Sequence, residues 1–281
     1  LEAQLADSDV AAEMFGYTEK QLPDGSPRTP LEELIRWRLW NRTGGGLMAE
    51  LGSHQLDAAG IFISAMHGKG KKVKPLTVTA VGNRSIFPDD REVDDHVYCM
   101  YEYPAPDYAE NPNKKIVVTY SSINGNGFGG YGEVVMGTNG TLILEQEQNV
   151  MLYKGSSRDT RVTVSKSKSG EAVLDTTESG GAGSVAAVPT EASGKAPPSR
   201  GYTEEMEHWA WCVRNPDPAN QPRCKPEVAI ADAVIALVSN MALKNTDGQP
   251  RVDFKEEWFD IESDVTPEGV KPNLQREQYK T

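Results

Sequence analysis

The chain has 281 residues, of which 38% are hydrophobic and 25% are charged, and its formal net charge at pH 7 is −12. This length allows one large domain or two small ones. The negative charge argues against nucleic acids and anionic membranes as partners, because phosphate binding needs a concentrated basic surface, and no apolar run approaches the roughly 20 residues of a membrane span.

The N-terminal segment, residues 1–30, is predicted to be a linker or a remnant that precedes the main domain. Its composition is mixed, and Pro23, Gly25 and Pro27 are typical of loops. The chain begins Leu-Glu-Ala rather than with Met, so we expect it to be a piece of a longer protein. Targeting signals could have been lost with the rest, which leaves localisation open between the cytoplasm and export.

A glycine triplet, residues 44–46, precedes a segment that predicts a helix over about 47–66. Along this helix Glu50, His54 and Asp57 follow one another at intervals of four and three residues, so their side chains share one face. The flanking positions are nearly all apolar, so most of the helix is expected to be buried. Its polar stripe must then meet a cleft, a metal or buried partners, because unpaired buried polar groups are costly.

Other interpretations of this stripe remain open. It could be the solvated side of an amphipathic helix, but such faces usually mix Lys with Glu, and no Lys or Arg occurs between Gly44 and His67. Helical geometry alone favours neither the functional interpretation of the stripe nor the solvated one. A metal site would need another His or Cys ligand, and the spacing of the four histidines resembles no zinc signature. We therefore expect no metal.

After this helix the hydrophobic pattern alternates with a period of two, which predicts strands. Short connections without helices join them, so we expect an open, largely antiparallel sheet. The sequence Gly-Thr-Asn-Gly at 137–140 predicts a tight hairpin turn. The expected strands are 76–82, 96–103, 116–122, 133–137, 141–145 and 149–153.

Residues from about 155 to 200 form a low-complexity insert in which 161–164 is the one expected strand. Helices over 203–213 and 226–238 and a short strand at 252–254 follow, and residues 261–281 form a tail. The fold class is therefore α+β, with helices packed on one face of the sheet, in a domain over 31–260. Cys212 and Cys224 could pair in an oxidising compartment, but free thiols are the expected state.

The order of elements and the helix motif resemble the C-terminal domain of the glucose-fructose oxidoreductase, inositol dehydrogenase and MocA (GFO/IDH/MocA) family. The family motif of an acidic residue, then Gly, His and Asp two, four and seven positions on, falls here on Glu50 to Asp57. The family more often has Asp where Glu50 stands. The lead-in 36–38 and the hairpin 133–142 are also similar, so the resemblance covers most of residues 31–260.

The resemblance implies a parent enzyme with an N-terminal Rossmann domain that binds NAD or NADP and oxidises a sugar or polyol hydroxyl. Its catalytic residues here would be His54, as base or proton relay, and Glu50. The substrate-binding candidates are Asp57, Trp40 and Arg42. For Asp57 the alternative is a structural role beside the site. General-base help from an imidazole suits alcohol oxidation, because its unperturbed pKa of about 6.5 lies near neutrality.

This chain lacks the Rossmann cofactor motif, a Gly-x-Gly-x-x-Gly between a strand and a helix. The glycine-rich stretch 125–130 lies between two expected strands instead. We therefore expect no cofactor-binding residue in this chain, and no activity from it alone. Two alternatives remain: a nicotinamide-dependent glycosidase of the same family, and a non-catalytic dimerisation or binding module. Whichever of these functions holds, we expect the chain to form a homo-oligomer through the sheet face.

Overall fold

The computed structural model describes residues 11–22, 24–68, 72–125, 130–146, 149–154, 163–166, 172–175, 186–187, 201–244, 248 and 250–269. Two compact units make up the chain. Unit 1 contains residues 1–127 and 223–281, and unit 2 contains residues 128–222. The domain boundaries at residues 30 and 260 stay predictions.

Unit 1 begins with a set of short elements that lead to the glycine triplet. A short helix, η1 (Ala12–Phe15), is followed by the antiparallel hairpin β1 (Lys20–Gln21) and β2 (Pro27–Arg28). Helix α2 (Pro30–Ile35) begins after Thr29, whose hydroxyl accepts a hydrogen bond from the Glu32 N–H at 3.1 Å, and η2 (Trp37–Leu39) follows it. The segment that composition predicts to be a linker therefore contains regular elements.

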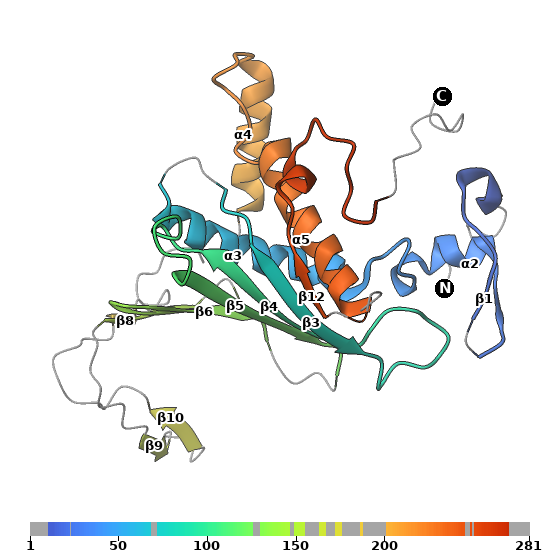
Figure 1. The fold of residues 1–281 in the computed structure, drawn as a ribbon, viewed down its shortest axis with the longest axis horizontal. Coiled ribbons are helices and arrows are strands. Elements are labelled where there is room, and N and C mark those ends of the chain that lie inside the picture. The colour runs from blue at the N-terminus through green and yellow to red at the C-terminus, as the bar shows by residue number, and fades with distance from the viewer. Residues whose placement is uncertain are drawn as a thin grey trace. The chain divides into compact units, whose positions relative to one another are not determined.

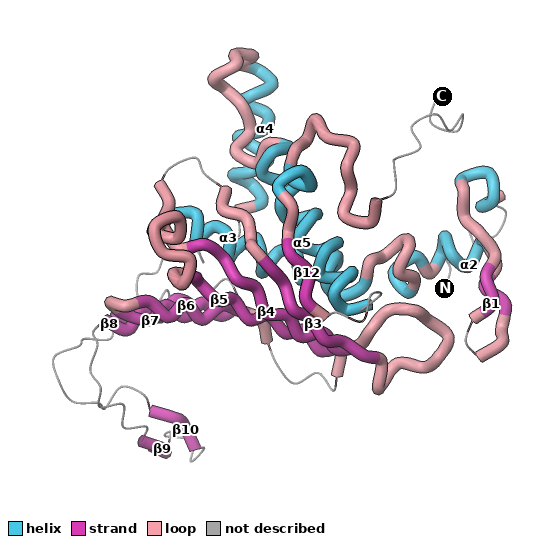
Figure 2. The backbone as a smooth tube through the Cα atoms, in the orientation of Figure 1, coloured by secondary structure: helices cyan, strands magenta, loops and turns pink. Residues whose placement is uncertain are grey.

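The core of unit 1 is a four-stranded sheet covered by helices, as Figures 1 and 2 show. Its order is β12-β3-β4-β5, and every neighbouring pair is antiparallel. The helices are the motif helix, which ends in α3 (Ser53–Met66), and α5 (Pro226–Lys244), and both contribute to the buried core. The predicted α+β class with an antiparallel sheet is confirmed. The strands are β3 (Thr77–Asn83), β4 (His96–Pro104), β5 (Lys115–Ile123) and β12 (Arg251–Asp253).

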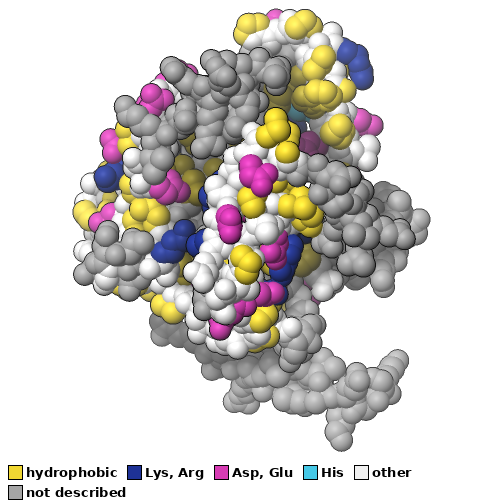
Figure 3. Space-filling view, turned by 90° about the vertical axis from the view of Figure 1, so that its right-hand side faces the viewer, with side chains coloured by type: hydrophobic (Ala, Val, Ile, Leu, Met, Phe, Trp, Pro, Cys, Tyr) yellow, Lys and Arg dark blue, Asp and Glu magenta, His cyan; other side chains and the backbone are white. Residues whose placement is uncertain are grey.

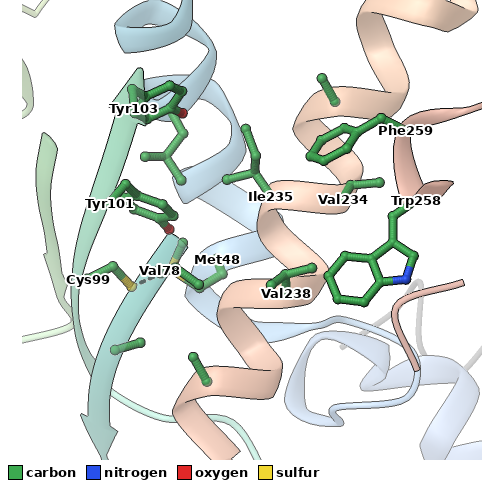
Figure 4. Packing of buried hydrophobic residues seen from close by; sticks show 14 of the residues in the cluster. Met48, Val78, Cys99, Tyr101, Tyr103, Val234, Ile235, Val238, Trp258 and Phe259 are labelled. Atoms are coloured by element: carbon green, nitrogen blue, oxygen red, sulfur yellow. Dashed lines mark hydrogen bonds between the residues drawn. The ribbon is translucent and has the colours of Figure 1, made fainter. Parts of the chain in front are cut away.

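The alternation of β4 shows why the sequence pattern predicted this sheet. Cys99 and Tyr101 are buried toward the helices, whereas Tyr98 and Met100 between them are exposed. In Figure 4 the buried side chains of β4 face those of α5. Met48 of the motif helix reaches into the same core and lies 3.7 Å from the Cys99 thiol, sulfur to sulfur (Figure 4).

Helix α5 is a core helix. Seven of its residues are buried. It is long and apolar enough to cross a membrane, but a helix packed inside a protein has the same composition. On the face in Figure 3, the described Lys and Arg side chains stand among Asp and Glu rather than in one basic surface.

Unit 2 contains the sheet β11-β8-β7-β6, again antiparallel throughout. The predicted hairpin forms, with Gly137 paired to Gly140. The low-complexity insert contains more strand than its composition predicts, and residues 161–162 lie outside the described part. The elements are β6 (Gly132–Gly137), β7 (Gly140–Glu145), β8 (Asn149–Lys154), β9 (Thr163–Lys166), β10 (Ala172–Asp175), β11 (Ala186–Ala187) and α4 (Tyr202–Arg214).

All three cysteines are free. Cys99 and Cys212 are buried and Cys224 is exposed. Burial raises the pKa of the Cys99 thiol to about 11, so this sulfur behaves as a packing group rather than as a nucleophile.

We expect unit 1 to lose stability in acid through Asp95, a buried carboxylate at the start of β4. Burial opposes its ionisation, but backbone N–H groups of Phe87 (2.7 Å), Ile86 (2.6 Å) and Ser85 (2.9 Å) and the ring of His96 hold its pKa at about 2. Because this pKa lies below the ordinary 3.8, the stabilisation is complete above pH 3.8 and is lost as the pH falls toward 2.

Thermal unfolding followed by circular dichroism across this pH range checks the expectation. Asp95→Asn should lower the thermal stability of the protein near neutral pH. It should also reduce the further loss of stability as the pH falls from 3.8 toward 2. Asp89→Asn, at a carboxylate that is 69% exposed, is the control and should leave the pH dependence of stability unchanged. Equal losses on acidification in the wild type and in Asp95→Asn would rule out this assignment.

Candidate active site

The motif helix contains a wide turn that the sequence pattern does not predict. Right-handed helical backbone begins at Leu47, and Met48–Gly52 form a π turn before α3 continues from Ser53. The Ser53 N–H donates to the Met48 carbonyl, five residues earlier, as a π turn requires. The predicted helix over 47–66 is thus present, with one turn wider than an α-helix just where Glu50 stands. Such turns are frequent at functional sites.

Glycines permit this geometry. Gly45 and Gly46 have φ of +70° and +66°, in the left-handed region that favours glycine. A Cβ on Gly52 would lie 2.9 Å from the Met48 Cε atom, so a side chain there would push Met48 out of the core. The glycines of the motif therefore fix where the helix begins and how it packs against the sheet.

Glu50 and His54 are both accessible at the N-terminal end of this helix. The Glu50 side chain is 31% exposed, and His54 is exposed in the first turn of α3. Within the described residues neither side chain makes a hydrogen bond. The fold therefore leaves the imidazole and this carboxylate available to a ligand.

Asp57, the third residue of the motif, is engaged in the structure. It forms an ion pair with Lys72, whose ammonium also lies 3.1 Å from the Asp232 carboxylate of α5. Burial works against the charge of Lys72, but the hydrogen bonds that its ammonium donates to both carboxylates raise its pKa, whereas burial raises the pKa of Asp232. Asp57 thus ties α3 to α5 through Lys72.

We expect Lys72→Met to lower the free energy of unfolding by about 1–3 kcal/mol, because two half-buried carboxylates would lose their shared cation. Lys114→Met is the control, since Lys114 and its partner Asp107 are both 57% exposed, and it should cost less than about 0.5 kcal/mol. Urea denaturation measures both. Equal stability of the two variants would show that the Lys72 cluster contributes little.

Trp40 lies in a buried cluster formed with the N-terminal elements, and Arg42, whose side chain is 50% exposed, contacts this cluster from its edge. Trp40 is fully buried, with the Arg28 guanidinium 5.0 Å from its ring centre, and Arg42 binds the buried Glu33 carboxylate, Nε to Oε1 at 3.0 Å. Among the described residues, no hydrogen bond or ion pair joins either side chain to Glu50 or His54. Their role in substrate binding stays a prediction, while their contacts are those of a folding cluster.

Two residues that the sequence analysis passed over lie beside the motif instead. The Arg38 Nε atom is 3.8 Å from the Glu50 carboxylate, and the Arg38 guanidinium carbon is 5.0 Å from the ring centre of Trp37. The sequence signal for the close packing of residues 37–38 on the motif is the glycine triplet, because closely spaced glycines often mark close approach of two backbone segments.

A surface hollow of about 350 Å³ lies elsewhere in unit 1, lined by Lys72, Lys74, Pro104, Phe254 and Glu256 among others. It includes neither Glu50 nor His54. Because both side chains are accessible to solvent, a substrate that bound at this face would need a second wall to exclude water.

No protein family and no curated protein matches this sequence. Solved structures that match part of this chain include a candidate NADPH-dependent oxidoreductase from Desulfitobacterium hafniense, with 13% identity, 77% of this chain and 51% of that chain covered, and a TM-score of 0.49. An oxidoreductase from Pseudomonas syringae has 12% identity, coverages of 80% and 60%, and a TM-score of 0.47.

A third structure is an oxidoreductase from Agrobacterium radiobacter in complex with NAD+, L-tartaric acid and magnesium, with 15% identity, coverages of 78% and 51%, and a TM-score of 0.42. Each of the three is described as an oxidoreductase. This chain spans 51% to 60% of their lengths.

Proposed function

We propose that this chain is the substrate and catalytic domain of a nicotinamide-dependent oxidoreductase of the GFO/IDH/MocA family, and that the parent enzyme oxidises a sugar or polyol hydroxyl. One observation carries the proposal. Of the three polar motif residues, Asp57 is engaged by Lys72, whereas Glu50 and His54 are accessible and make no hydrogen bond among the described residues. These two are the residues to which the family resemblance assigns the chemistry.

Alcohol oxidation requires the hydroxyl proton to leave as the hydride leaves the carbon. An exposed imidazole can accept that proton and pass it to solvent. Glu50 stands four residues before His54 on the same helix, at a spacing that brings two side chains to one helix face. His54 is therefore proposed as the base and Glu50 as the group that orients it or binds a substrate hydroxyl.

The proposal places no dinucleotide on this chain. Residues 126–129 of the glycine-rich stretch lie outside the described part of the chain, and the next described element after it is strand β6 rather than a helix that could hold a pyrophosphate. The nicotinamide, which would accept the hydride, must then be held by another part of the parent protein. That part would also supply the second wall of the face with Glu50 and His54.

The test uses the full-length gene product, a panel of sugars and polyols, and either NAD+ or NADP+. Net formation of reduced cofactor supports the dehydrogenase proposal. Release of a sugar from a glycoside without net reduction would favour the glycosidase, because that route regenerates the cofactor. Oligomerisation without sugar or cofactor binding would favour a binding module.

We also propose that a second copy of the chain covers the outer face of the unit 1 sheet. The paired residues Val81 and Tyr98 are 64% and 47% exposed there, and Met100 is 49% exposed. An apolar sheet face of this kind needs a cover. Tyr98→Glu combined with Met100→Lys should convert a dimer to a monomer in light scattering, and an unchanged mass would contradict this interface.

A further inference from the structure

We propose that Arg38 and Trp37 recognise the substrate and that the substrate is a sugar acid, a polyhydroxylated compound with a carboxylate. This inference rests on the proposed function, because it concerns the same surface. It follows from the contacts that the fold gives Arg38 and from the hydrogen-bond donors that it leaves free.

Arg38 is an arginine whose N–H donors the fold leaves free of hydrogen bonds, and it lies beside Glu50 of the motif. Residues 24–68 and 72–125 contain six arginines, and Arg38 is the one that donates no hydrogen bond to the described residues. Its side chain is 68% exposed. A guanidinium offers five N–H donors in a planar fork, so this cation keeps its full binding capacity. The others donate to carboxylates, a hydroxyl or backbone carbonyls: Arg28, Arg36, Arg42, Arg84 and Arg91.

The backbone holds Arg38 beside the motif. A Cβ on Gly44 would lie 2.9 Å from the Arg38 Cα atom and 2.9 Å from the Trp37 carbonyl oxygen, so only glycine fits against this segment. The Thr43 hydroxyl donates to the same Trp37 carbonyl at 2.6 Å. Arg38 is thus fixed at its backbone, while its long side chain remains free to adjust.

Trp37 gives the guanidinium a flat support. The ring is 43% exposed, and the guanidinium carbon lies 5.0 Å from its centre. A guanidinium over an indole is stabilised by cation–π attraction and keeps its in-plane donors for other partners. The exposed part of the indole can also pack on the apolar side of a sugar ring.

A carboxylate is the group that this arrangement fits best. Paired N–H donors of arginine match the two carboxylate oxygens, and such charge-assisted bonds are stronger than those to a neutral hydroxyl. Glu50 does not use this capacity, because its 3.8 Å separation from Arg38 is an ion pair without a hydrogen bond. In a chain of net charge −12, an anionic substrate also needs a local cation of this kind.

The first experiment compares matched pairs, glucose with glucuronate and galactose with galacturonate, as substrates of the full-length gene product. We expect the acid to be preferred. Arg38→Met should lower kcat/KM for the acid about 10- to 100-fold, mainly through KM, and should affect the neutral partner at least several-fold less. Arg38→Lys keeps the charge without the planar fork and should recover part of the loss.

Arg223→Met is the control, because Arg223 is also exposed and makes no hydrogen bond among the described residues. Arg223→Met should leave kcat/KM unchanged for both the acid and the neutral sugar. Preference for the neutral sugars, or equal losses on both classes in Arg38→Met, would overturn the sugar-acid inference while the proposed function stands.

Absence of cofactor reduction with every compound would instead count against the proposed function. Binding then decides the inference by itself, through saturation-transfer NMR of glucuronate and glucose with the full-length gene product. Glucuronate binding that Arg38→Met abolishes would support recognition by Arg38. Equal binding in the two forms, or no binding at all, would refute it.

Discussion

Replacing His54 by Asn in the full-length gene product is expected to lower kcat on its sugar or polyol substrate by about 10²–10⁴-fold, which is the usual contribution of a general base. The expectation follows from the exposure of His54 and from its lack of hydrogen bonds to the described residues. The same features predict that the substitution leaves the fold unchanged, because no packing or polar contact depends on the ring.

Steady-state kinetics combined with urea denaturation separate the two effects. His208→Asn is the control, since His208 lies on α4 outside the motif and stacks on Trp211. It should retain turnover. If His54→Asn keeps near-normal kcat, the imidazole is not the base and the assignment of the site is wrong.

Replacing Glu33 by Ala is expected to lower the free energy of unfolding by about 3–5 kcal/mol, the usual cost of breaking a buried ion pair on one side. Glu33 is fully buried, and its carboxylate accepts from the Thr18 N–H at 2.8 Å and from Arg42. It also pairs at 3.0 Å with Arg28, which is only 3% exposed. Without Glu33 the buried Arg28 would lose its closest counter-charge.

The pKa of Glu33 fits this role. Burial alone would raise it, but hydrogen bonds from Arg42 and Thr18 hold it below its ordinary value. Its stabilisation is therefore complete above that ordinary value and is lost as the pH falls below it. Urea denaturation of Glu33→Ala checks the prediction beside Glu32→Ala, because Glu32 pairs with Arg36 at 2.8 Å but is 30% exposed. Equal stability of the two variants would contradict a central role for Glu33.

Much of the fold could be predicted because its signals are local. The alternation in β4 and the 137–140 turn each depend on residues close in sequence, and both appear in the structure. The motif helix was also predicted, since nearly all residues after the glycine triplet are apolar and the polar residues among them are spaced to share one helix face.

The features that the sequence did not predict depend on contacts between distant residues. Lys72 joins carboxylates 15 and 160 positions away, and no local pattern indicates such a pairing. The elements within residues 12–28 were missed for the same reason, because Glu33 and Arg42 hold this segment through long-range polar contacts. The π turn at Met48–Gly52 also escaped prediction, since an α-helical period was assumed throughout.

The prediction for Trp40 and Arg42 used sequence distance to the motif as a guide to spatial distance. The turn at 40–44 reverses the chain, with the Gly44 N–H donating to the Trp40 carbonyl at 2.8 Å. As a result, Arg38 lies beside Glu50, while Arg42 points to Glu33. The candidate site therefore keeps Glu50 and His54 from the sequence analysis and gains Arg38 from the structure.

Calorimetric titration of the full-length gene product and of this chain with NAD and NADP tests the central claim most directly. The account predicts tight binding of one dinucleotide by a product longer than this chain by about one domain, and no binding by this chain alone. A gene product no longer than this chain, or one that binds neither dinucleotide, would contradict the account.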